Sequence, residues 1–566
     1  MSTFHQSPPA LAGNQYLDDR VLRSYLRRVL PAAVHRAVEP SLIRFGARAA
    51  GEVFALGEAA EAEPPRHVPY DPWGRRVDRI ETSAAWRALD RISAEEGLVA
   101  IGYEREHGEY SRIDQLARLY LFSPSSATYS CPLAMSDGAA RCIEVYGGDD
   151  ERLRRAYEHL TTRDPEQFWT SGQWMTERTG GSDVSGTSTV ARCEEGVYRL
   201  YGTKWFTSAT TSQMAMTLAR IEGAPAGSRG LSLFYLELRD AEGALRDVRV
   251  HRLKDKLGTR ALPTAELSLE GTPAWLVGGE GNGVRKIAAL FNVTRIYNAC
   301  AAVAGMRRAV ALARDYARRR VAFGRPIIEH PLHAETLAEM QVELEGAFHL
   351  VFRVVELLGR SECGTANERD AALLRLLTPV AKLYTGKQAV AVASEALEAF
   401  GGAGYIEDTG LPRLLRDAQV LSIWEGTTNV LSLDLLRAID AGNGVEALAS
   451  DVHDRLAGVS APELAGAVAR VREAVPRVVE HAARAAEGRE PADPGAREVG
   501  ARALAFGVAR TYAGALLLEH AAWSLAHEGD RRPAIAAMRW CERELVPVVE
   551  GDARHRADSR ALALDG

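Results

Sequence analysis

Glu425 is a lone carboxylate in the apolar and aromatic stretch SIWEGTTNV (422–430). Acids on a protein surface usually have polar neighbours, and core positions usually exclude a charge. Removal from water disfavours the charged form of a carboxylate, which is one way in which enzymes tune a general base. Two interpretations stay open for Glu425: a catalytic base, or an acid that caps or pairs at the start of a helix.

A second candidate site is the segment QWMTERTGGSDVSGTST (173–189), which is rich in glycine, serine and threonine. Gly180 and Gly181 would expose backbone amides beside the hydroxyl groups of Thr176 and Ser182. Such a rim suits a flat or phosphorylated ligand. The alternative is an ordinary hairpin loop of the same composition.

The segment GTKWFTSAT (202–210) follows within the length of one hairpin. Trp205 offers a flat face for stacking, and Thr207 and Ser208 could bond to the edge of a stacked ring. A tryptophan in the core of a sheet is the commoner case. Because two hydroxyl-rich loops and an aromatic residue are expected on adjacent strands, the combination favours a ring-binding site.

Two glycine turns lie further along the chain. In YARRRVAFGRPI (316–327), Arg320 stands near Phe323 at a helix end. It could hold a pyrophosphate there, or only complement the helix dipole. FGGAGYIED (400–408) permits close approach of the backbone. It is not a GxGxxG that follows a strand, so no Rossmann site is expected.

The bulk composition is that of an ordinary globular protein. The chain has 566 residues, 46% of them hydrophobic and 25% charged, and a formal net charge of −6. This length suggests roughly three or four domains. The balanced charge gives no support for nucleic acid as a partner.

Cysteine and histidine usage indicates a reducing compartment and no metal. Six cysteines are scattered without a CxxC pair, which favours the cytoplasm over a disulfide framework or a zinc cluster. His330 and His333 have no acidic or thiol ligand nearby. The N-terminal stretch lacks the blocks of a signal peptide. No apolar run approaches the roughly 18 residues of a membrane helix, so no membrane partner is expected.

The periodicity of the sequence changes from helical to strand-rich and back to helical. Helical spacing runs from Leu17 to about Leu160, with a proline-rich break at 63–74, and it returns from Gly283. The last part, from about residue 445, is alanine-rich helix broken at 487–498. The intervening short runs predict an antiparallel sheet or barrel, and so an α+β fold class. These runs are YRLYGTKWFT, MAMTLARI, LSLFYLEL and TAELSLEG.

Six motifs occur in the order and spacing of the acyl-CoA dehydrogenase superfamily, which the chain resembles over roughly residues 80–440. They are TERTGGSD, KWFTS, RVAFG, FGGAGY, RLLRDA and IWEGTTN. The Gly-Gly-Ser-Asp form of the first motif, HRLKDKLGTR (251–260), YDPWGRRVD (70–78) and the long C-terminal helical part look like the AidB-like branch. That branch is associated with the response to DNA alkylation.

The resemblance implies an acyl-CoA dehydrogenase-like fold of four domains, assembled as a homotetramer or dimer of dimers. The domains would be an N-terminal helical domain (1–168), a middle antiparallel β-domain (169–277), a helical bundle for FAD and substrate (278–444) and an extra C-terminal helical domain (445–566).

The resemblance also implies that FAD is the cofactor and that Glu425 is the catalytic base. Arg320 and Phe323 would reach the FAD of a neighbouring subunit. The residues that match FAD-contacting positions are Met175, Thr176, Gly181, Ser182, Trp205, Phe206, Thr207, Arg320, Phe323, Gly401, Gly402, Trp424, Thr427 and Asn429. The residues that match substrate-binding positions are Ser182, Arg295 and Gly426.

The implied reaction is α,β-dehydrogenation of an acyl-CoA thioester. The α-proton is too weakly acidic for a free carboxylate, so the site must combine a base with hydrogen bonds to the thioester oxygen. The β-hydrogen would leave as hydride to the flavin. Electrons would then pass to an electron-transfer flavoprotein or to oxygen.

Two other functions stay open. One is a flavoprotein with little turnover that protects DNA, which would need Arg470, Arg472, Arg477 and Arg484 to form a basic surface. The nearly balanced charge of the C-terminal part speaks against it. The other is a flavin monooxygenase on the same scaffold, which would not need Glu425.

Two features of the sequence bear on the use of coenzyme A. In FNVTR, Asn292 replaces an acid that many members of the superfamily carry, while Arg295 stays. Asp434 and Arg437 lie one helical turn apart, where they could line the pocket or form an ordinary surface ion pair.

Overall fold

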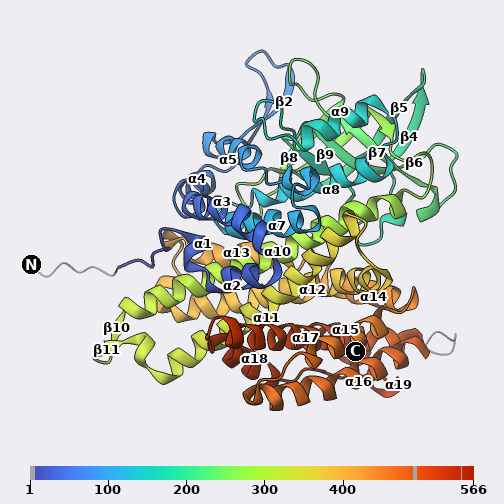
Figure 1. Ribbon diagram of the computed structural model, residues 1–566. Helices are drawn as coiled ribbons and strands as arrows, with labels where there is room; N and C mark the ends of the chain where they lie inside the picture. The colour runs from blue at the N-terminus through green and yellow to red at the C-terminus, as the bar shows by residue number, and fades with distance from the viewer. Residues whose placement is uncertain (1–6, 488–493, 550, 566) are drawn as a thin grey trace, which may run out of the picture. The chain divides into compact units, whose positions relative to one another are not determined.

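The computed structural model describes residues 7–487, 494–549 and 551–565 (Figure 1). The chain divides into two compact units. The first is formed by Met1–Ile43, His107–Leu116 and Asn298–Gly566, and the second by Arg44–Glu106 and Ala117–Tyr297. The chain passes from one unit to the other within the helices α3 (Ala32–Ala50), α7 (Ser111–Phe122) and α10 (Gly283–Arg319), and also between Glu106 and His107.

The second unit begins with helices and a two-stranded hairpin. Its helices are α4 (Glu52–Ala62), α5 (Ala84–Glu95), α6 (Ile101–Glu104), α8 (Ser130–Tyr146) and α9 (Glu151–Leu160). The hairpin pairs β1 (Arg66–Tyr70) with β2 (Arg76–Glu81) in antiparallel fashion.

This hairpin corrects the prediction of a simple proline-rich break in a helical region. Asp71 closes its turn, because the carboxylate accepts hydrogen bonds of 2.9 Å from the backbone N–H groups of Trp73 and Arg75. Gly74 has a φ of +81°, which glycine adopts without strain. Turn residues are common to loops and hairpins, so the sequence pattern did not separate the two.

The strand-rich region forms a seven-stranded sheet. Its strands are β3 (Ser171–Gln173), β4 (Val190–Glu194), β5 (Val197–Ser208), β6 (Met214–Ile221), β7 (Leu231–Glu237), β8 (Val248–Leu253) and β9 (Thr264–Leu276). Strands β4, β5, β9, β7 and β6 pair in a closed ring, so the sheet is a small barrel. The prediction of an entirely antiparallel sheet is wrong in one respect, because β6 pairs in parallel with both β3 and β4.

Strand β6 shows how this sheet buries two apolar faces. Met214, Met216 and Leu218 pack in a core cluster with residues of α8, α9 and the start of α10. Ala215 and Ala219 point the other way, into a second cluster that includes Trp174. The alternation has the period of two that a strand imposes.

The first unit is helical. Its helices, besides parts of the three that continue into the second unit, are α1 (Gln15–Asp18), α2 (Arg20–Val29), α11 (Pro331–Glu362), α12 (Glu368–Ala399), α13 (Pro412–Leu421), α14 (Thr428–Asp440), α15 (Gly444–Ala457), α16 (Ala465–Glu487), α17 (Pro494–His527), α18 (Arg532–Glu542) and α19 (Ala553–Leu564). It also holds a small hairpin of β10 (Val321–Ala322) and β11 (Arg325–Pro326). Of the predicted break at 487–498, residues 494–498 belong to α17 and Glu487 ends α16, while residues 488–493 lie outside the described part of the chain.

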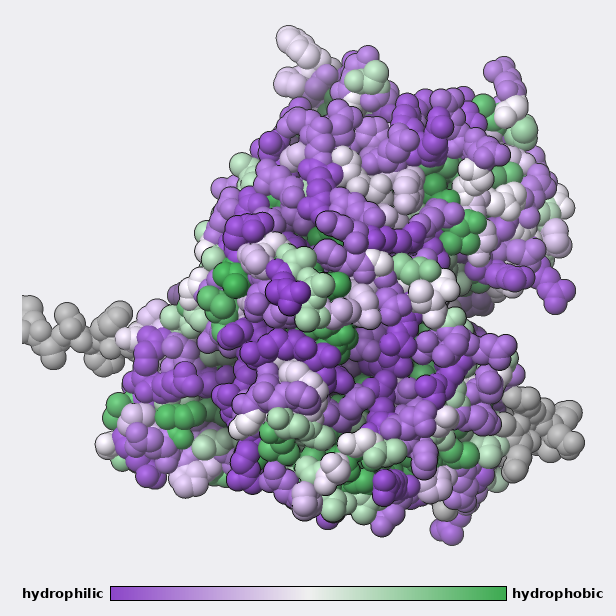
Figure 2. Space-filling view, in the orientation of Figure 1, coloured by the Kyte–Doolittle hydropathy of each residue, from purple (hydrophilic) through white to green (hydrophobic). Residues whose placement is uncertain are grey.

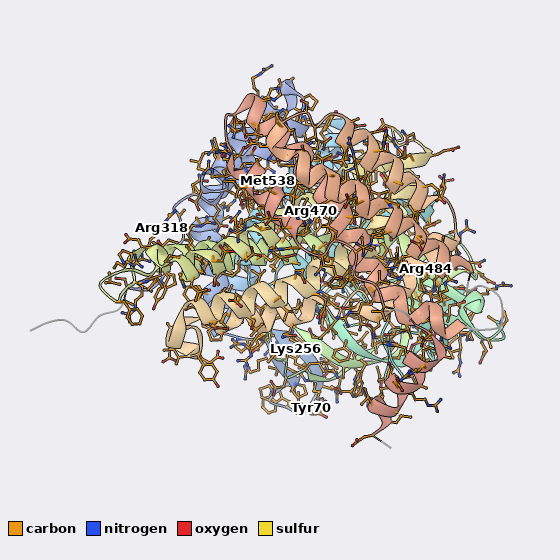
Figure 3. The ribbon with its side chains drawn as sticks, turned by 90° about the horizontal axis from the view of Figure 1, so that it is seen from below. Tyr70, Lys256, Arg318, Arg470, Arg484 and Met538 are labelled. Carbon is orange, nitrogen blue, oxygen red and sulfur yellow. The ribbon has the colours of Figure 1, made fainter. Side chains whose placement is uncertain are left out.

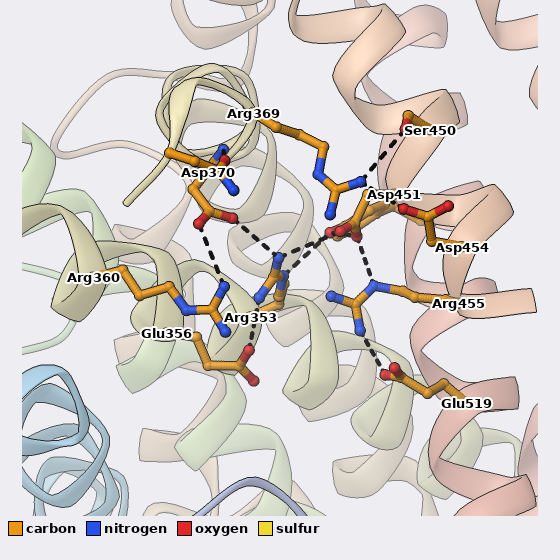
Figure 4. A network of polar contacts seen from close by, with 12 residues as sticks. Arg353, Glu356, Arg360, Arg369, Asp370, Ser450, Asp451, Asp454, Arg455 and Glu519 are labelled. Carbon is orange, nitrogen blue, oxygen red and sulfur yellow. Dashed lines mark hydrogen bonds and ion pairs between the residues drawn. The ribbon is translucent and has the colours of Figure 1, made fainter. Parts of the chain in front are cut away.

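A buried ionic network joins the C-terminal helices to α11 and α12 (Figure 4). Arg353 of α11 lies 2.8 Å from Glu356 and 3.5 Å from Asp451 of α15. Asp451 also binds Arg455 at 2.6 Å, which in turn binds Glu519 of α17 at 2.6 Å. Charged groups without water are tolerated when each has a partner of opposite charge, so this network fixes the position of α15 and α17.

Within the described residues, α10 is the one helix long and apolar enough to cross a membrane, judged by length and composition. Its most apolar stretch is 67% buried inside the protein, as in a core helix. On the face of the molecule in Figure 2, hydrophilic side chains predominate and apolar ones form separate small patches.

Candidate active site

Glu425 lies in the short turn between α13 and α14. Its φ is +57°, and that of the following Gly426 is +106°. A left-handed backbone is strained for a residue with a side chain, and such residues cluster at functional sites. The side chain is half-buried, and Trp424 beside it is half-buried too.

Neighbouring helices hold this turn at both ends. The Nζ of Lys382, on α12, donates a hydrogen bond of 2.6 Å to the Gly426 carbonyl oxygen. Asn298, on α10, donates one of 3.0 Å to the Leu421 carbonyl oxygen and accepts another from the indole Nε1 of Trp424.

Close packing fixes the turn further. A Cβ on Gly386 of α12 would lie 2.6 Å from the Leu421 oxygen, and a Cβ on Gly426 would lie 2.9 Å from Leu431. Because neither site has room for a side chain, the backbone of the turn has little freedom.

The cap of α14 decides part of the question that Glu425 raised. Thr427, not Glu425, is the N-cap, and its hydroxyl accepts from the N–H of Val430 at 3.4 Å. Asn429 lies exposed in the first turn of the helix. The capping interpretation of Glu425 is therefore wrong, while its pairing with another group and its role as a base stay predictions.

The predicted glycine turns are both exposed in the first unit. Gly401, with a φ of +61°, begins a 3₁₀ turn that ends α12, and Gly402 follows it. In the β10–β11 hairpin, Phe323 and Gly324 have φ values of +51° and +81°, as a two-residue hairpin turn requires. Phe323 is 96% exposed and Arg320 is exposed beside it, so both side chains project away from their own chain.

In the second unit, a buried carboxylate anchors the loop predicted at 173–189. Glu177 accepts hydrogen bonds from the backbone and hydroxyl groups of Ser188 and Thr189, over 2.5 to 3.2 Å. It also pairs with Lys204 of β5 at 2.9 Å. Burial raises the pKa of Glu177, but the charge of Lys204 and these hydrogen bonds outweigh it and lower the pKa to about 2. The Glu177 carboxylate is therefore charged at neutral pH, and its hydrogen bonds connect the two ends of the loop.

The rim of this loop faces solvent. Glu177 and Gly180 exchange backbone hydrogen bonds in a tight turn, after which Gly181 and Ser182 are exposed. A side chain on Gly181 would collide with the hydroxyl of Thr176. The exposed rim of amides and hydroxyls fits the predicted contact with a ligand.

Trp205 lies beside that rim. Its backbone N–H donates a hydrogen bond of 3.0 Å to the Thr176 carbonyl oxygen. Its half-buried ring has the Nζ of Lys254 3.8 Å from its centroid, and the same Nζ lies 4.5 Å from the ring centroid of the exposed Phe206. Lys254 binds Glu266 at 2.6 Å.

Two of the predicted contacts are buried. Met175 packs its side chain into the core cluster under the sheet. Thr207 is fully buried, and its hydroxyl donates across the sheet to the Ala265 carbonyl oxygen at 2.9 Å. These two residues could therefore contribute to ligand binding only through their backbone atoms or through the shape of the sheet.

The remaining predicted residues are spread over both units. In the second unit, Arg295 is half-buried on α10 and Asn292 is exposed there. In the first unit, Asp434 pairs with Arg375 of α12 at 2.9 Å. Asp434 therefore has an ion-pair partner on another helix.

Sequence reasoning missed Lys382, Asn298 and the anchoring role of Glu177. The signal for Lys382 was a positive charge within the largely apolar segment TPVAKLYTG (378–386). Glu425 is likewise a charged residue among apolar ones. Asn298 carried no such signal, because an amide is common on any helix. Glu177 was hidden among the polar residues of its loop.

The arginines that a nucleic acid site would need lie on α16. Figure 3 labels two of them, Arg470 and Arg484. Arg470, Arg477 and Arg484 repeat every seven residues and share one exposed stripe. Glu473 and Glu480 lie on the same stripe, so it alternates in charge and is not a basic surface.

The chain matches four family descriptions that follow one another along the sequence. They are the adaptive response protein AidB N-terminal domain (residues 5–164), the acyl-CoA dehydrogenase middle domain (172–272), the acyl-CoA dehydrogenase C-terminal domain (281–439) and the acyl-CoA dehydrogenase 11 C-terminal domain-like family (444–566).

Two relatives illustrate the match. "Acyl-CoA dehydrogenase family member 11" of Caenorhabditis elegans is 45% identical over 558 residues, which cover 96% of this chain and 90% of the relative. "Putative acyl-CoA dehydrogenase AidB" of Escherichia coli is 34% identical over 415 residues, which cover 72% of this chain and 75% of that one.

Solved structures agree with the fold. The structure of Caenorhabditis elegans ACDH-11 in complex with C11-CoA matches with a TM-score of 0.96 and 44% identity, over 100% of this chain and 97% of the other. An acyl-CoA dehydrogenase complexed with FAD from Bacillus anthracis matches with a TM-score of 0.72 over 94% and 90%, and at 20% identity bears on the fold alone. The predicted fold class is thus confirmed, and the chain belongs to the AidB-like branch of the acyl-CoA dehydrogenases, a family of oxidoreductases whose cofactor is FAD.

Proposed function

We propose that this protein introduces an α,β double bond into an acyl-CoA, with FAD as cofactor and Glu425 as base. The observation that carries the proposal is the strained turn of Glu425, which bonds from α10 and α12 hold in place. A backbone strain of this kind costs about 1 to 3 kcal/mol and persists where the surroundings enforce it. A surface acid would need no such support.

Each unit by itself contains residues whose chemistry suits a flavin cofactor. Thr176, Gly181 and Ser182 would offer amides and hydroxyls to the ring, with Trp205 packed beside them. Gly401 and Gly402 would let the backbone approach the cofactor closely, and Arg320 carries the charge to bind a pyrophosphate. FAD, when bound, supplies the redox chemistry by accepting the β-hydrogen as hydride.

The protein's own contribution is to position the thioester and take its α-proton. Glu425 accepts that proton at its carboxylate, and the electron pair left at the α-carbon forms the double bond as the β-hydrogen departs. The α-proton becomes acidic enough only if hydrogen bonds stabilise the thioester oxygen. The backbone N–H at the base residue, fixed in direction by the turn, is suited to donate one of them.

A fatty acyl-CoA of intermediate length is the substrate that we propose. The C11-CoA in the structure of the Caenorhabditis elegans relative supports it. Ser182, Arg295 and Gly426 would contact the substrate. Electrons would then pass to an electron-transfer flavoprotein or to oxygen.

We also propose a cytoplasmic homotetramer. Phe323, Leu332 and Tyr405 are 96%, 81% and 90% exposed on the first unit, which is unusual for large apolar side chains and suits burial against another subunit. All six cysteines are thiols and not disulfides, which suits a reducing compartment.

The test is an anaerobic titration of the purified yellow protein with acyl-CoAs of increasing chain length. We expect the flavin absorbance to bleach with chains of intermediate length, and Glu425→Gln to retain FAD without bleaching. A wild-type spectrum that stays unchanged with every acyl-CoA would overturn the proposed substrate class. Bleaching of Glu425→Gln at the wild-type rate would remove Glu425 from the reaction.

A further inference from the structure

Lys382 is a buried cation on α12 whose burial the fold alone does not require. Its side chain has no exposed surface, and the segment around it is mostly apolar. An ammonium group loses strong hydration on burial, and only hydrogen bonds and opposite charges offset that cost. A leucine or methionine would fill the same space at no such cost.

The ammonium group bonds to the turn that carries the proposed base. Its Nζ lies 2.6 Å from the Gly426 carbonyl oxygen, one residue beyond Glu425. Hydrogen bonds from a charged donor are shorter and stronger than neutral ones. This bond fixes the peptide plane between Gly426 and Thr427, and Thr427 in turn caps α14.

The same turn contains the two adjacent left-handed residues, Glu425 and Gly426. Glycine has the widest choice of backbone angles, so the carbonyl of Gly426 could rotate in many directions if nothing held it. Rotation of that peptide group would change the ψ angle of Gly426, so Glu425 would be less firmly fixed relative to α14.

We propose that Lys382 is a positioning residue for Glu425, which acts by clamping the Gly426 carbonyl group. The proposal rests on the function proposed above, in which Glu425 is the base. Asn298 holds the other end of the turn, through Leu421 and Trp424, so the two helices α10 and α12 fix the base from both sides. In this scheme Lys382 acts through the main chain of the turn.

The test compares Lys382→Met with Lys382→Arg, which keeps a charged donor, and with Thr385→Val as a matched control. Thr385 is equally buried on the same helix, but its hydroxyl bonds only the helix backbone, at the Ala381 oxygen. The measurements are FAD content, affinity for acyl-CoA, and the single-turnover rate of flavin reduction at saturating substrate.

For Lys382→Met we expect the rate of flavin reduction to fall about 10- to 100-fold, because a small misplacement of a catalytic group costs that much. FAD content and substrate affinity should stay close to wild type, which a general loss of structure would not allow. Lys382→Arg should recover most of the rate, and Thr385→Val should match wild type.

Lys382→Gln is measured as a second variant. Its side chain is polar but neutral, and it is shorter than that of lysine. A wild-type rate in whichever of Lys382→Met and Lys382→Gln retains FAD overturns the proposal. Glu425→Gln separates the two possible failures. If Glu425→Gln shows no flavin reduction while the Lys382 variants reduce flavin at the wild-type rate, only the proposed role of Lys382 is refuted. If Glu425→Gln also reduces flavin at the wild-type rate, the proposed function itself is refuted.

Discussion

The carboxylate of Glu177 and the ammonium group of Lys204 form a buried ion pair 2.9 Å long, in which Lys204 has no exposed surface and Glu177 only 3%. The pair links the glycine-rich loop to the middle of β5, next to Trp205. Lys204 also donates to the Leu218 carbonyl oxygen at 3.3 Å, so it connects three segments of the barrel.

Removal of either partner should destabilise the protein strongly. We expect Glu177→Gln and Lys204→Met each to cost about 3 to 5 kcal/mol, because each leaves a buried charge without its partner. The double variant should lose clearly less than the sum, since it removes both charges. Urea unfolding of the four proteins measures the three differences. Additive losses would mean that the two groups do not interact.

An exposed pair on the same sheet provides the control. Arg192 and Glu222 lie 3.4 Å apart with about half or more of each side chain exposed. Glu222→Gln should change the free energy of unfolding by less than about 1 kcal/mol.

A second prediction concerns pH and a buried pair of histidines. The rings of His349 and His520 lie 4.6 Å apart, both almost fully buried. Burial, and then the neighbouring positive charges, hold the pKa of each well below its ordinary value of 6.5. The unfolded chain therefore binds protons in a range where the folded protein does not. Stability should be full above about pH 6.5 and should fall as the pH is lowered from there.

His349→Leu should flatten this dependence. Neither ring nitrogen of His349 has a hydrogen-bond partner, so the replacement of this side chain by leucine breaks no hydrogen bond. Thermal melting at pH 7, 6 and 5 should show a smaller decrease of Tm for the variant than for wild type. His453→Gln, at an exposed position on α15, serves as the control and should keep the wild-type slope. Equal slopes for all three proteins would contradict the prediction.

A third prediction concerns the network of Figure 4. Asp451 accepts from Arg455 at 2.6 Å and from the Tyr512 hydroxyl at 2.5 Å, in addition to Arg353. Burial raises its pKa, but the two arginines outweigh burial and lower it. Asp451→Asn keeps the shape but removes the charge between two buried arginines, so we expect a loss of about 3 kcal/mol in urea unfolding.

Asp454→Asn, one helical turn away, is the matched control. Asp454 pairs with Arg369 at 2.6 Å, yet both side chains are exposed. Its removal should cost about 0.5 kcal/mol or less. A similar small cost for Asp451→Asn would show that the buried network adds no stability.

Strong periodicity made parts of the fold predictable. The long helix α10 and strand β6 begin and end close to where the sequence placed them, because each has an unbroken apolar pattern. Strands β4 and β8 carried no such pattern, since both are short and expose charged side chains. The parallel pairing of β6 with β4 follows from closure of the barrel, which no local pattern reports.

The candidate site was predictable where a residue contradicts its neighbours. Glu425 was found because a carboxylate is unusual between tryptophan and glycine. Lys382 has an equally unusual setting, but lysine is frequent in helices and its partner is a backbone oxygen 44 positions away. The support of a site by distant main-chain contacts is therefore the part that the sequence hides.

A last prediction concerns Arg320 and retention of the cofactor. Arg320 stands exposed at the end of α10, beside the hairpin that presents Phe323. If this guanidinium binds the pyrophosphate of FAD on a second subunit, Arg320→Ala should purify with clearly less flavin than wild type, measured as the ratio of flavin to protein absorbance. Arg318→Ala, which removes another exposed arginine from the same helix end (Figure 3), should keep the wild-type ratio. Light scattering on both variants separates loss of a phosphate contact from loss of assembly. A variant at Arg320 with the full flavin content would refute the contact, because an arginine that binds a pyrophosphate contributes about 1.5 to 3 kcal/mol through each charged hydrogen bond.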